Sequence, residues 1–327
     1  MQKLVVLLLA LIASVAVSQP VYAQSNDAKG VGDSLKISPL RTDLTIQPGD
    51  TAKATVYIQN LNPIPVTLHM ISNDFIAGDK ENGVPNIILD EDKYAPTHSL
   101  KRFMQTTRDF TVGPGERKGV DVVIKVPSGA QAGGYYGAIR FITADSAGNK
   151  NVNVKGSVAS LLILTVPGNL VESLSLKEFS LQHNGKGFGH IVNSPDKVES
   201  VIRLENKGNL HLAPFGLVTV QKGKKTIYEA KINDTQPPGL VLPDSTRKFT
   251  TPVKNLSKFG KYKVIATLGY GENGQTITAE RTFWVIPTTY IFGAIGALFI
   301  LIGVIVLVVS SLRSYKRRIL RQARRRR

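Results

Sequence analysis

Val120-Asp121-Val122-Val123-Ile124-Lys125-Val126 decides the fold, because apolar side chains occupy every second position of this stretch. Successive side chains of a β-strand point to opposite faces, so one face of the stretch is apolar throughout. Other runs of the same kind recur at residues 35–37, 54–58, 201–204 and 262–268. No segment before residue 288 repeats apolar residues with the 3.6-residue period of a helix. The sequence therefore predicts an all-β fold for this region.

A faint internal repeat divides the β region into two halves. One strand is expected to end at Asn60-Leu61-Asn62, and its counterpart at Asn206-Lys207-Gly208. Further on, Gly134-Tyr135 opens a strand in the first half, as Gly260-Lys261-Tyr262 does in the second. Asn and Gly suit such places because they tolerate the positive φ of tight turns. We expect two tandem immunoglobulin-like β-sandwiches, at residues 34–167 and 168–287, after a linker at residues 24–33.

A charge-free apolar stretch precedes a basic C-terminus. A helix needs about 20 apolar residues to cross a bilayer, and residues 288–312 supply them. Residues 313–327 are rich in arginine, and basic residues next to a span stay in the cytoplasm. The sequence predicts a single transmembrane helix, a cytoplasmic tail and β domains outside the cell. Trp284, Tyr290 and Arg313 are expected at the membrane interface.

The N-terminus has the features of a secretory signal. Lys3 is followed by an apolar stretch at residues 4–17 and by Val21-Tyr22-Ala23. This order predicts a signal peptide at residues 1–23, cleaved between Ala23 and Gln24. The alternative, an uncleaved second span, is disfavoured because the apolar stretch is too short.

Composition narrows the class of protein. The chain has 41 Lys and Arg, 24 Asp and Glu, and a formal net charge of +17. Ten of the basic residues lie in the signal and the tail, which leaves an excess of +7 outside the cell. The high charge therefore reports membrane orientation, and no nucleic-acid partner is expected. The mildly basic extracellular part suits an acidic surface polymer.

The residues of common catalytic and metal sites are missing from the sequence. Cysteine is absent, and none of the five histidines lies in an HExxH motif. No serine has the G-x-S-x-G context of a nucleophile. We expect no enzymatic activity, no metal and no cofactor.

Three motifs have competing interpretations. Gly185-Lys186-Gly187 resembles a phosphate loop, but a hairpin turn is due there. The acids at residues 90–92 lack the spacing of calcium ligands, which favours a solvated acidic turn. Residues 286–290 have the layout of a sortase signal, yet Tyr290 stands where such signals carry a small residue. The sequence therefore favours permanent anchoring.

The first half contains a long segment at residues 75–108 where the alternation weakens. It carries aromatic faces and cationic groups that suit a ligand, at Tyr94, His98, Lys101, Arg102 and Phe103. The alternative is a solvated loop with Phe103 tucked into the sandwich.

A glycine-rich strand start at residues 133–139 supplies one more candidate. Gly134 is expected to let backbones approach closely, and Tyr135 to pack like the tyrosine of a sandwich corner. Tyr136 points to the opposite face and is the better ligand candidate.

Several first-half motifs resemble the WxL-interacting family of Gram-positive surface proteins. They are Ser38-Pro39, Pro48-Gly49-Asp50, Asn60-Leu61-Asn62, Asn82-Gly83, Pro114-Gly115-Glu116 and the stretch from Val126-Pro127 through Gly133-Gly134-Tyr135-Tyr136-Gly137. The resemblance implies a first domain that binds peptidoglycan and a second that binds a host or partner protein. The second half matches in layout alone.

The sequence thus predicts a non-enzymatic protein of the cell membrane that binds a wall polymer such as peptidoglycan, a surface partner protein, or both. An alternative is a structural accessory subunit of a membrane transporter or an envelope assembly complex. The charge-free span offers no intramembrane polar residues for a transport path of its own.

Overall fold

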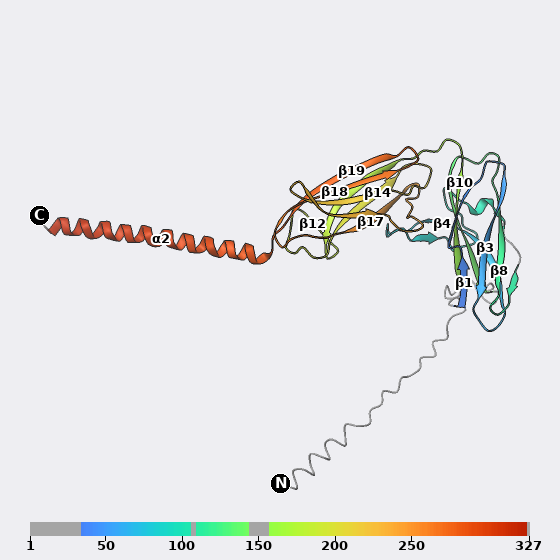
Figure 1. The fold of residues 1–327 in the computed structure, drawn as a ribbon, viewed down its shortest axis with the longest axis horizontal. Coiled ribbons are helices and arrows are strands. Elements are labelled where there is room, and N and C mark those ends of the chain that lie inside the picture. Colours follow the sequence, from blue (N-terminus) through green and yellow to red (C-terminus); the bar gives the residue numbers. More distant parts are fainter. Residues whose placement is uncertain (1–33, 106–108, 144–156, 326–327) are drawn as a thin grey trace, which may run out of the picture.

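The computed structural model describes residues 34–105, 109–143 and 157–325. The predicted signal peptide, its cleavage between Ala23 and Gln24, and the linker at residues 24–33 lie outside the described residues. The described chain forms two β-sandwiches, made of four sheets, and one long C-terminal helix (Figure 1). The predicted fold class is confirmed.

The first sandwich consists of two sheets packed face to face. One sheet has the order β1 (Leu35–Ser38), β3 (Thr51–Asn60), β8 (Arg117–Lys125) and β6 (Met104–Gln105). The other has the order β2 (Arg41–Thr45), β10 (Val158–Val166), β9 (Gly133–Thr143), β4 (Val66–Ala77) and β5 (Pro85–Ile87), and β7 (Phe110–Val112) also pairs with β4. The first strand is thus shared between the two sheets as β1 and β2, and β2 runs parallel to β10.

The second sandwich repeats this arrangement. One sheet has the order β12 (Lys186–Phe188), β11 (Leu174–His183), β14 (Val198–Asn206) and β17 (Ser245–Val253). The other has the order β13 (Ile191–Val192), β19 (Gln275–Val285), β18 (Gly260–Tyr270), β15 (Phe215–Lys222) and β16 (Lys225–Ile232). Here β13 runs parallel to β19, as β2 does to β10. The central strands follow the same order in both sandwiches, as in an immunoglobulin-like duplication, and the edges differ, because β6 lies beside β8 whereas β12 lies beside β11.

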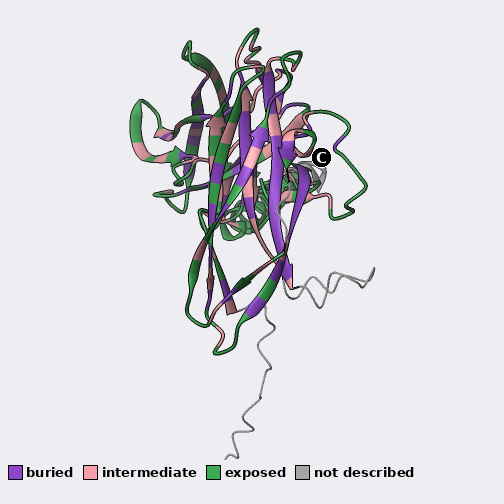
Figure 2. Cartoon of the chain, turned by 90° about the vertical axis from the view of Figure 1, so that its right-hand side faces the viewer, coloured by how far each residue is buried: buried purple, intermediate pink, exposed green. Residues whose placement is uncertain are grey.

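Each sandwich has its own apolar core, which follows the alternation of its strands. In β8, Val120, Val122 and Ile124 are buried, whereas Asp121 is exposed. In β18, Tyr262, Val264, Ala266 and Leu268 are buried in the second core. The strands carry most of the buried residues, and the loops and turns at their ends are mostly exposed (Figure 2). A third, smaller cluster lies between the sandwiches.

The segment at residues 75–108 differs from the excursion that the sequence predicted. Strand β4 continues through Phe75 to Ala77, and β5 pairs with its end. Phe75 is buried, so this part of the segment belongs to the sheet and not to a loop. The short helix η2 (Lys101–Phe103) lies near the end of the segment. Between β5 and η2, residues 88–100 form no strand, which accounts for the weakened alternation there.

The turn at Gly185 matches the hairpin interpretation. Asn184 and Gly185 both have positive φ, 51° and 75°, and join β11 to β12. A two-residue turn of this kind requires positive φ at both positions, which explains the glycine without a phosphate ligand.

The chain ends in helix α2 (Thr288–Arg325). Within Thr288–Ser314, an 18-residue stretch reaches a mean hydropathy of 3.0, and none of it is buried by the rest of the described chain. The helix is long and apolar enough to cross a membrane. Two residues, Ile286 and Pro287, separate its start from the end of β19 at Val285.

Candidate functional site

The two sandwiches are joined by polar contacts along one side of their interface. Arg203 of β14 donates from Nε and Nη2 to the carboxylate of Glu81, at 2.7 and 2.5 Å. The backbone N–H of Lys248 donates to the carbonyl of Glu81 at 2.7 Å. The hydrogen bond from Arg203 lowers the pKa of Glu81. The turn that carries Glu81 is thereby fixed to the second sandwich.

A second set of contacts depends on a glycine. The N–H of Gly134 donates to the carbonyl of Asn209 at 2.8 Å, and Nδ2 of Asn209 donates to the carbonyl of Ala132 at 3.0 Å. A Cβ on Gly134 would lie 2.2 Å from the hydroxyl oxygen of Tyr136. A side chain at Gly134 is thus excluded by Tyr136 of the same sandwich, whereas a Cβ on Gly133 would lie 2.7 Å from the carbonyl oxygen of Asn209, so Gly133 is the residue that permits the close approach to the second sandwich.

Tyr136 lies buried between the sandwiches. Its ring is 5.7 Å from that of Phe75 and 5.8 Å from that of His211, and its hydroxyl is 3.4 Å from Nδ1 of His211. Burial raises the pKa of Tyr136 and lowers the pKa of His211 to about 4. Both groups are therefore neutral near pH 7, as an apolar interface requires.

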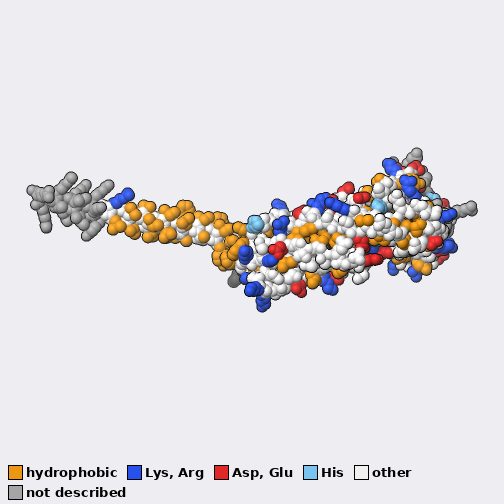
Figure 3. Space-filling model, turned by 90° about the horizontal axis from the view of Figure 1, so that it is seen from above, with side chains coloured by type: hydrophobic (Ala, Val, Ile, Leu, Met, Phe, Trp, Pro, Cys, Tyr) orange, Lys and Arg blue, Asp and Glu red, His pale blue; other side chains and the backbone are white. Residues whose placement is uncertain are grey.

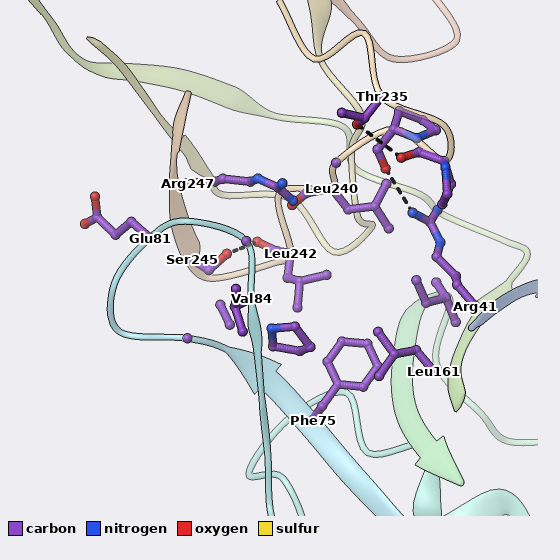
Figure 4. Close-up of a pocket in the computed structure, with 18 of the residues that line it drawn as sticks. Arg41, Phe75, Glu81, Val84, Leu161, Thr235, Leu240, Leu242, Ser245 and Arg247 are labelled. Atoms are coloured by element: carbon purple, nitrogen blue, oxygen red, sulfur yellow. Dashed lines mark hydrogen bonds between the residues drawn. The ribbon is translucent and has the colours of Figure 1, made fainter. Parts of the chain in front are cut away.

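An apolar cavity of about 220 Å³ opens beside these contacts (Figure 4). We call it the interdomain groove. The first sandwich supplies one wall and the loop between β16 and β17 supplies the other. Its apolar lining is Phe75, Val84, Pro85, Leu161, Ile163, Leu240 and Leu242. Because both sandwiches line it, the groove exists only in the assembled pair.

Two arginines border the interdomain groove. Arg41 donates to the carbonyl of Pro238 at 2.9 Å and is paired with Asp43 at 2.8 Å. Arg247 donates from Nη1 to the carbonyl of Leu240 at 2.8 Å. Its buried Nε has no hydrogen-bond partner among the described residues. Burial, with Arg41 nearby, lowers the pKa of Arg247.

The guanidinium of Arg247 packs directly on glycine backbone. A Cβ at Gly83 would lie 2.1 Å from its Cζ, and one at Gly239 would lie 2.3 Å from its Nη2. The two glycines come from different sandwiches, so Arg247 is clamped across the interface. Nε of this clamped group is itself buried and has no hydrogen-bond partner among the described residues.

Three of the residues predicted as ligand contacts form a separate surface, the Tyr94 platform, made of Tyr94, Lys101 and Arg102. Nζ of Lys101 and Cζ of Arg102 each lie 4.6 Å from the centre of the Tyr94 ring. Tyr94 is 47% exposed. Lys101 also donates to the carbonyl of Lys93 at 2.9 Å and to that of Glu91. Lys101 therefore supports the turn beneath the platform as well as facing the ring.

A buried carboxylate fixes the segment that carries the Tyr94 platform. Asp74 accepts hydrogen bonds from the N–H of Ala95 at 2.8 Å, the hydroxyl of Ser99 at 2.6 Å and the N–H of Lys101 at 2.8 Å. Asp74 is fully buried on β4. A buried carboxylate that accepts hydrogen bonds from several backbone N–H groups fixes the conformation of a loop, as strand pairing would.

The other three predicted contacts are used within the protein. Nδ1 of His98 is 2.6 Å from the carbonyl of Gly134. Phe103 packs on the first core, with its ring 4.8 Å from that of Tyr135, as the alternative interpretation expected. Tyr135 donates to the carbonyl of Gln131 at 2.8 Å, the bond of a tyrosine corner. Tyr136 does not face a free surface, because the second sandwich covers the face that alternation assigned to it.

Two predicted membrane-interface aromatics lie together at the start of the helix. The ring of Phe259 is 6.3 Å from that of Trp284 and 5.7 Å from that of Tyr290. Arg313 is exposed toward the other end of the apolar segment. The described residues contain no group of three or more His, Cys, Asp or Glu side chains placed to hold a metal ion.

The sequence offered only a weak sign of the interdomain groove. Gln236-Pro237-Pro238-Gly239 has the composition of a turn, and the apolar Leu240 and Leu242 follow it directly. Arg41 and Arg247 had no motif around them. An apolar pair directly after a rigid proline turn was the available signal.

Comparison with known proteins yields fold similarity alone. No family model matches the chain, and no curated protein matches it. The solved class 5 fimbriae chaperone CfaA is 13% identical, with a TM-score of 0.38, covering 76% of this chain and 98% of that chain. The E. coli chaperone DraB is 15% identical, with a TM-score of 0.32, over 77% and 96%. A PapD-like domain of human CEP192 is 13% identical, with a TM-score of 0.28, over 46% and 96%. The resemblance to the WxL-interacting family stays a prediction from the sequence.

Proposed function

We propose that this protein is a non-enzymatic, membrane-anchored surface protein whose two sandwiches act as one binding body, and that the interdomain groove binds an apolar segment of a partner protein. The observation that supports this most is the groove itself. It combines an apolar lining from both sandwiches with a buried arginine donor that has no partner among the described residues.

The size of the groove favours a polypeptide over a small molecule. Small-molecule sites enclose about 300–1,000 Å³, and the interdomain groove is smaller at about 220 Å³. A cavity of this size accommodates one or two anchoring side chains, which is how protein partners commonly gain most of their affinity. The positive charge of Arg247 at the border of the groove favours a partner segment with a carbonyl or a carboxylate beside those side chains.

The C-terminal helix supports the anchoring part of the proposal. The segment Thr288–Ser314 exposes apolar side chains that no other described part of the chain covers. A bilayer removes such a surface from water, and the basic tail at residues 313–327 then stays in the cytoplasm. The sandwiches lie on the outer side of the membrane.

Site-specific photo-crosslinking in intact cells tests the groove. A photoreactive residue at Thr235, which is exposed and lines the groove, is expected to give a discrete adduct with one protein. The control position is Leu61, an exposed apolar residue at the opposite end of β4. Val84→Lys places a charge in the groove at a residue that is 61% exposed and should abolish the Thr235 adduct. Equal adducts from both positions, or an adduct that survives Val84→Lys, contradict the proposal.

The identity of the adduct separates two kinds of partner. A surface protein of the wall fits the leading proposal. A transporter subunit or an envelope assembly component fits the accessory-subunit alternative, with the same groove as the contact.

A second candidate function is binding of a wall polymer, favoured by the Tyr94 platform. An exposed aromatic ring with two cations on a fixed segment suits a sugar face that carries negative charge. Binding of isolated sacculi by the purified full chain tests this function. No sacculus binding at low salt contradicts it and leaves the groove proposal unaffected.

A further inference from the structure

Eight lysines gather at the end of the second sandwich that meets the helix. We call them the lysine collar: Lys186, Lys197, Lys222, Lys224, Lys225, Lys254, Lys258 and Lys261. All eight are exposed. None of them forms an ion pair within the part of the chain that the structure describes. Figure 3 shows Lys and Arg side chains where the second sandwich meets the apolar helix.

Strand pairing brings the collar together from distant parts of the sequence. Gly260, at the start of β18, pairs with Val285, at the end of β19, so the loop carrying Lys254 and Lys258 lies beside the helix start. Nζ of Lys222 lies 3.3 Å from the hydroxyl of Ser257 in that loop. On the other sheet, Lys186 lines the same surface hollow as Ile286 and Ile291. The collar therefore surrounds the point where the chain enters the helix.

The collar accounts for the whole charge excess of the extracellular part. The loops and turns that carry it, residues 184–186, 193–197, 222–225 and 254–261, contain one acid, Asp196. Eight lysines and one acid give +7, equal to the excess of 31 basic over 24 acidic residues between the signal and the tail. The rest of the extracellular part is neutral in sum. The excess of positive charge that composition shows is thus located at one end of one sandwich.

Aromatic side chains accompany the lysines at the helix start. Phe259 is 51% exposed, Trp284 39% and Tyr290 60%. Amphipathic rings of this kind prefer the headgroup level of a bilayer. Lysines beside them lie where a cation meets lipid phosphates.

The connection between β19 and α2 is too short to separate the lysine collar from the helix. Two residues reach about 7 Å when extended. Two backbone hydrogen bonds also fix the end of β19 and the first residue of the connection. The Trp284 N–H donates to the His190 carbonyl at 2.7 Å, and the Ile286 N–H donates to the Val192 carbonyl at 2.9 Å. A bilayer around the helix therefore meets the collar at its headgroups.

From these observations we infer that the lysine collar binds anionic lipid headgroups and seats the second sandwich on the membrane surface. The inference rests on the anchoring part of the proposed function and adds a lipid class and a contact surface to it. Each lysine near an anionic surface contributes about 1 kcal/mol, and the contribution falls within a Debye length of about 10 Å at 0.1 M salt. Contact is therefore stronger on anionic than on neutral bilayers and weakens with salt.

The fluorescence of Trp284 measures this contact without an added label, because the chain has a single tryptophan. The full chain is reconstituted in phosphatidylcholine vesicles with or without phosphatidylglycerol. Quenching by lipids brominated near the headgroup is expected to be about twofold greater with phosphatidylglycerol at low salt, and the difference should vanish at 1 M salt, where the Debye length is about 3 Å.

A matched pair of variants assigns the effect to the collar. Replacing Lys224, Lys225, Lys254 and Lys258 by Gln should remove the phosphatidylglycerol-dependent part of the quenching. Replacing four exposed lysines of the first sandwich, Lys36, Lys53, Lys80 and Lys125, by Gln should leave it unchanged. Equal loss in both variants overturns the inference, because it indicates a response to net charge.

Flotation and alkaline extraction of the same vesicles distinguish a failure of membrane anchoring from a failure of lipid binding by the collar. A chain that is extracted by alkali overturns anchoring and the collar together. A chain that resists extraction but shows the same Trp284 quenching in both lipid mixtures overturns the collar alone. Greater quenching with phosphatidylglycerol that the collar variant loses supports it.

Discussion

Asn60 and Asn206 occupy the same place in the two sandwiches and make the same three hydrogen bonds. Both side chains are fully buried at the end of their strands. Nδ2 of Asn60 donates to the carbonyls of Ile64 at 2.8 Å and Val112 at 3.1 Å, and its Oδ1 accepts from the N–H of Asn62 at 2.9 Å.

Asn206 repeats this pattern in the second sandwich. Its Nδ2 donates to the carbonyls of Leu210 at 2.7 Å and Val241 at 2.9 Å, and its Oδ1 accepts from the N–H of Gly208 at 2.9 Å. In each sandwich the amide closes the turn after the strand and ties it to a neighbouring segment. The repeated asparagine in the sequence is therefore a repeated structural device.

Replacing either asparagine by aspartate should destabilise its own sandwich. The substitution keeps the shape but removes two donors and places a carboxylate against two carbonyls, which costs about 2–4 kcal/mol in the free energy of unfolding. The two losses should add within about 0.5 kcal/mol, because the sites share no partner. Urea unfolding of the full chain in detergent measures this. Asn82→Asp is the control, since exposed Asn82 only accepts a hydrogen bond, from Val84 N–H.

The buried imidazole of His211 should make stability depend on pH. Its pKa falls from 6.5 to about 4 in the folded protein. Between these values the unfolded chain binds a proton that the folded chain does not, so the free energy of unfolding decreases as pH falls from about 6.5 to about 4, by up to about 3 kcal/mol. Above pH 6.5 this contribution is complete.

Thermal unfolding at a series of pH values tests this dependence. His211→Asn should flatten the change between pH 6.5 and 4, because it removes the titrating group and keeps a polar atom near Nδ1. His190→Gln, at an exposed histidine, should leave the change in place. A pH profile that is the same in wild type and His211→Asn speaks against the assignment.

Gly83→Ala should loosen the contact between the sandwiches. The glycine has φ of 81°, and the added Cβ would meet the clamped guanidinium of Arg247. The combined strain and displacement should cost about 1–3 kcal/mol and weaken the groove adduct. Gly115→Ala is the matched control, because its φ is 70° but nothing lies within 4 Å of the added Cβ. Equal effects at both positions would assign the loss to backbone strain alone.

Arg102→Ala and Tyr94→Ala should reduce sacculus binding in different ways. Removing the arginine should lower both the binding and its salt sensitivity, because charge attraction is screened by salt. Removing the ring should lower the part that persists at high salt, since stacking is not screened. Lys125→Ala, at an exposed lysine on β8 outside the Tyr94 platform, is expected to behave as wild type. Unchanged binding in both platform variants would sink this second candidate function.

Membrane orientation can be read by protease protection. Protease added to spheroplasts should remove epitopes in both sandwiches and spare a tag placed after Arg327, because the basic tail is retained inside. The tag should become accessible after detergent is added. Protected sandwiches and a digested tag would reverse the orientation.

The sequence was sufficient for features that depend on neighbours along the chain. Alternation around Val122 and Ile124 gave buried strands, and the Gly-Tyr order gave the strand start at Gly134. The interdomain groove depends on Arg41 and Pro238, which lie 197 residues apart and meet only after both sandwiches fold. Tyr136 was misjudged for the same reason, because alternation gives the face of a side chain but not what covers that face.

The short connection after Val285 limits how far the interdomain groove lies from the membrane, as well as attaching the sandwiches to it. Strand β18 has 11 residues and runs from the collar end of the second sandwich toward the first, about 36 Å at roughly 3.3 Å per residue. With the collar on the lipid, the interdomain groove lies near the far end of this strand, at most about this distance above the bilayer, and the two-residue connection leaves no room for a flexible stalk. A partner must therefore project its segment to that level, so the second sandwich works as a spacer that selects ligands by how far they reach.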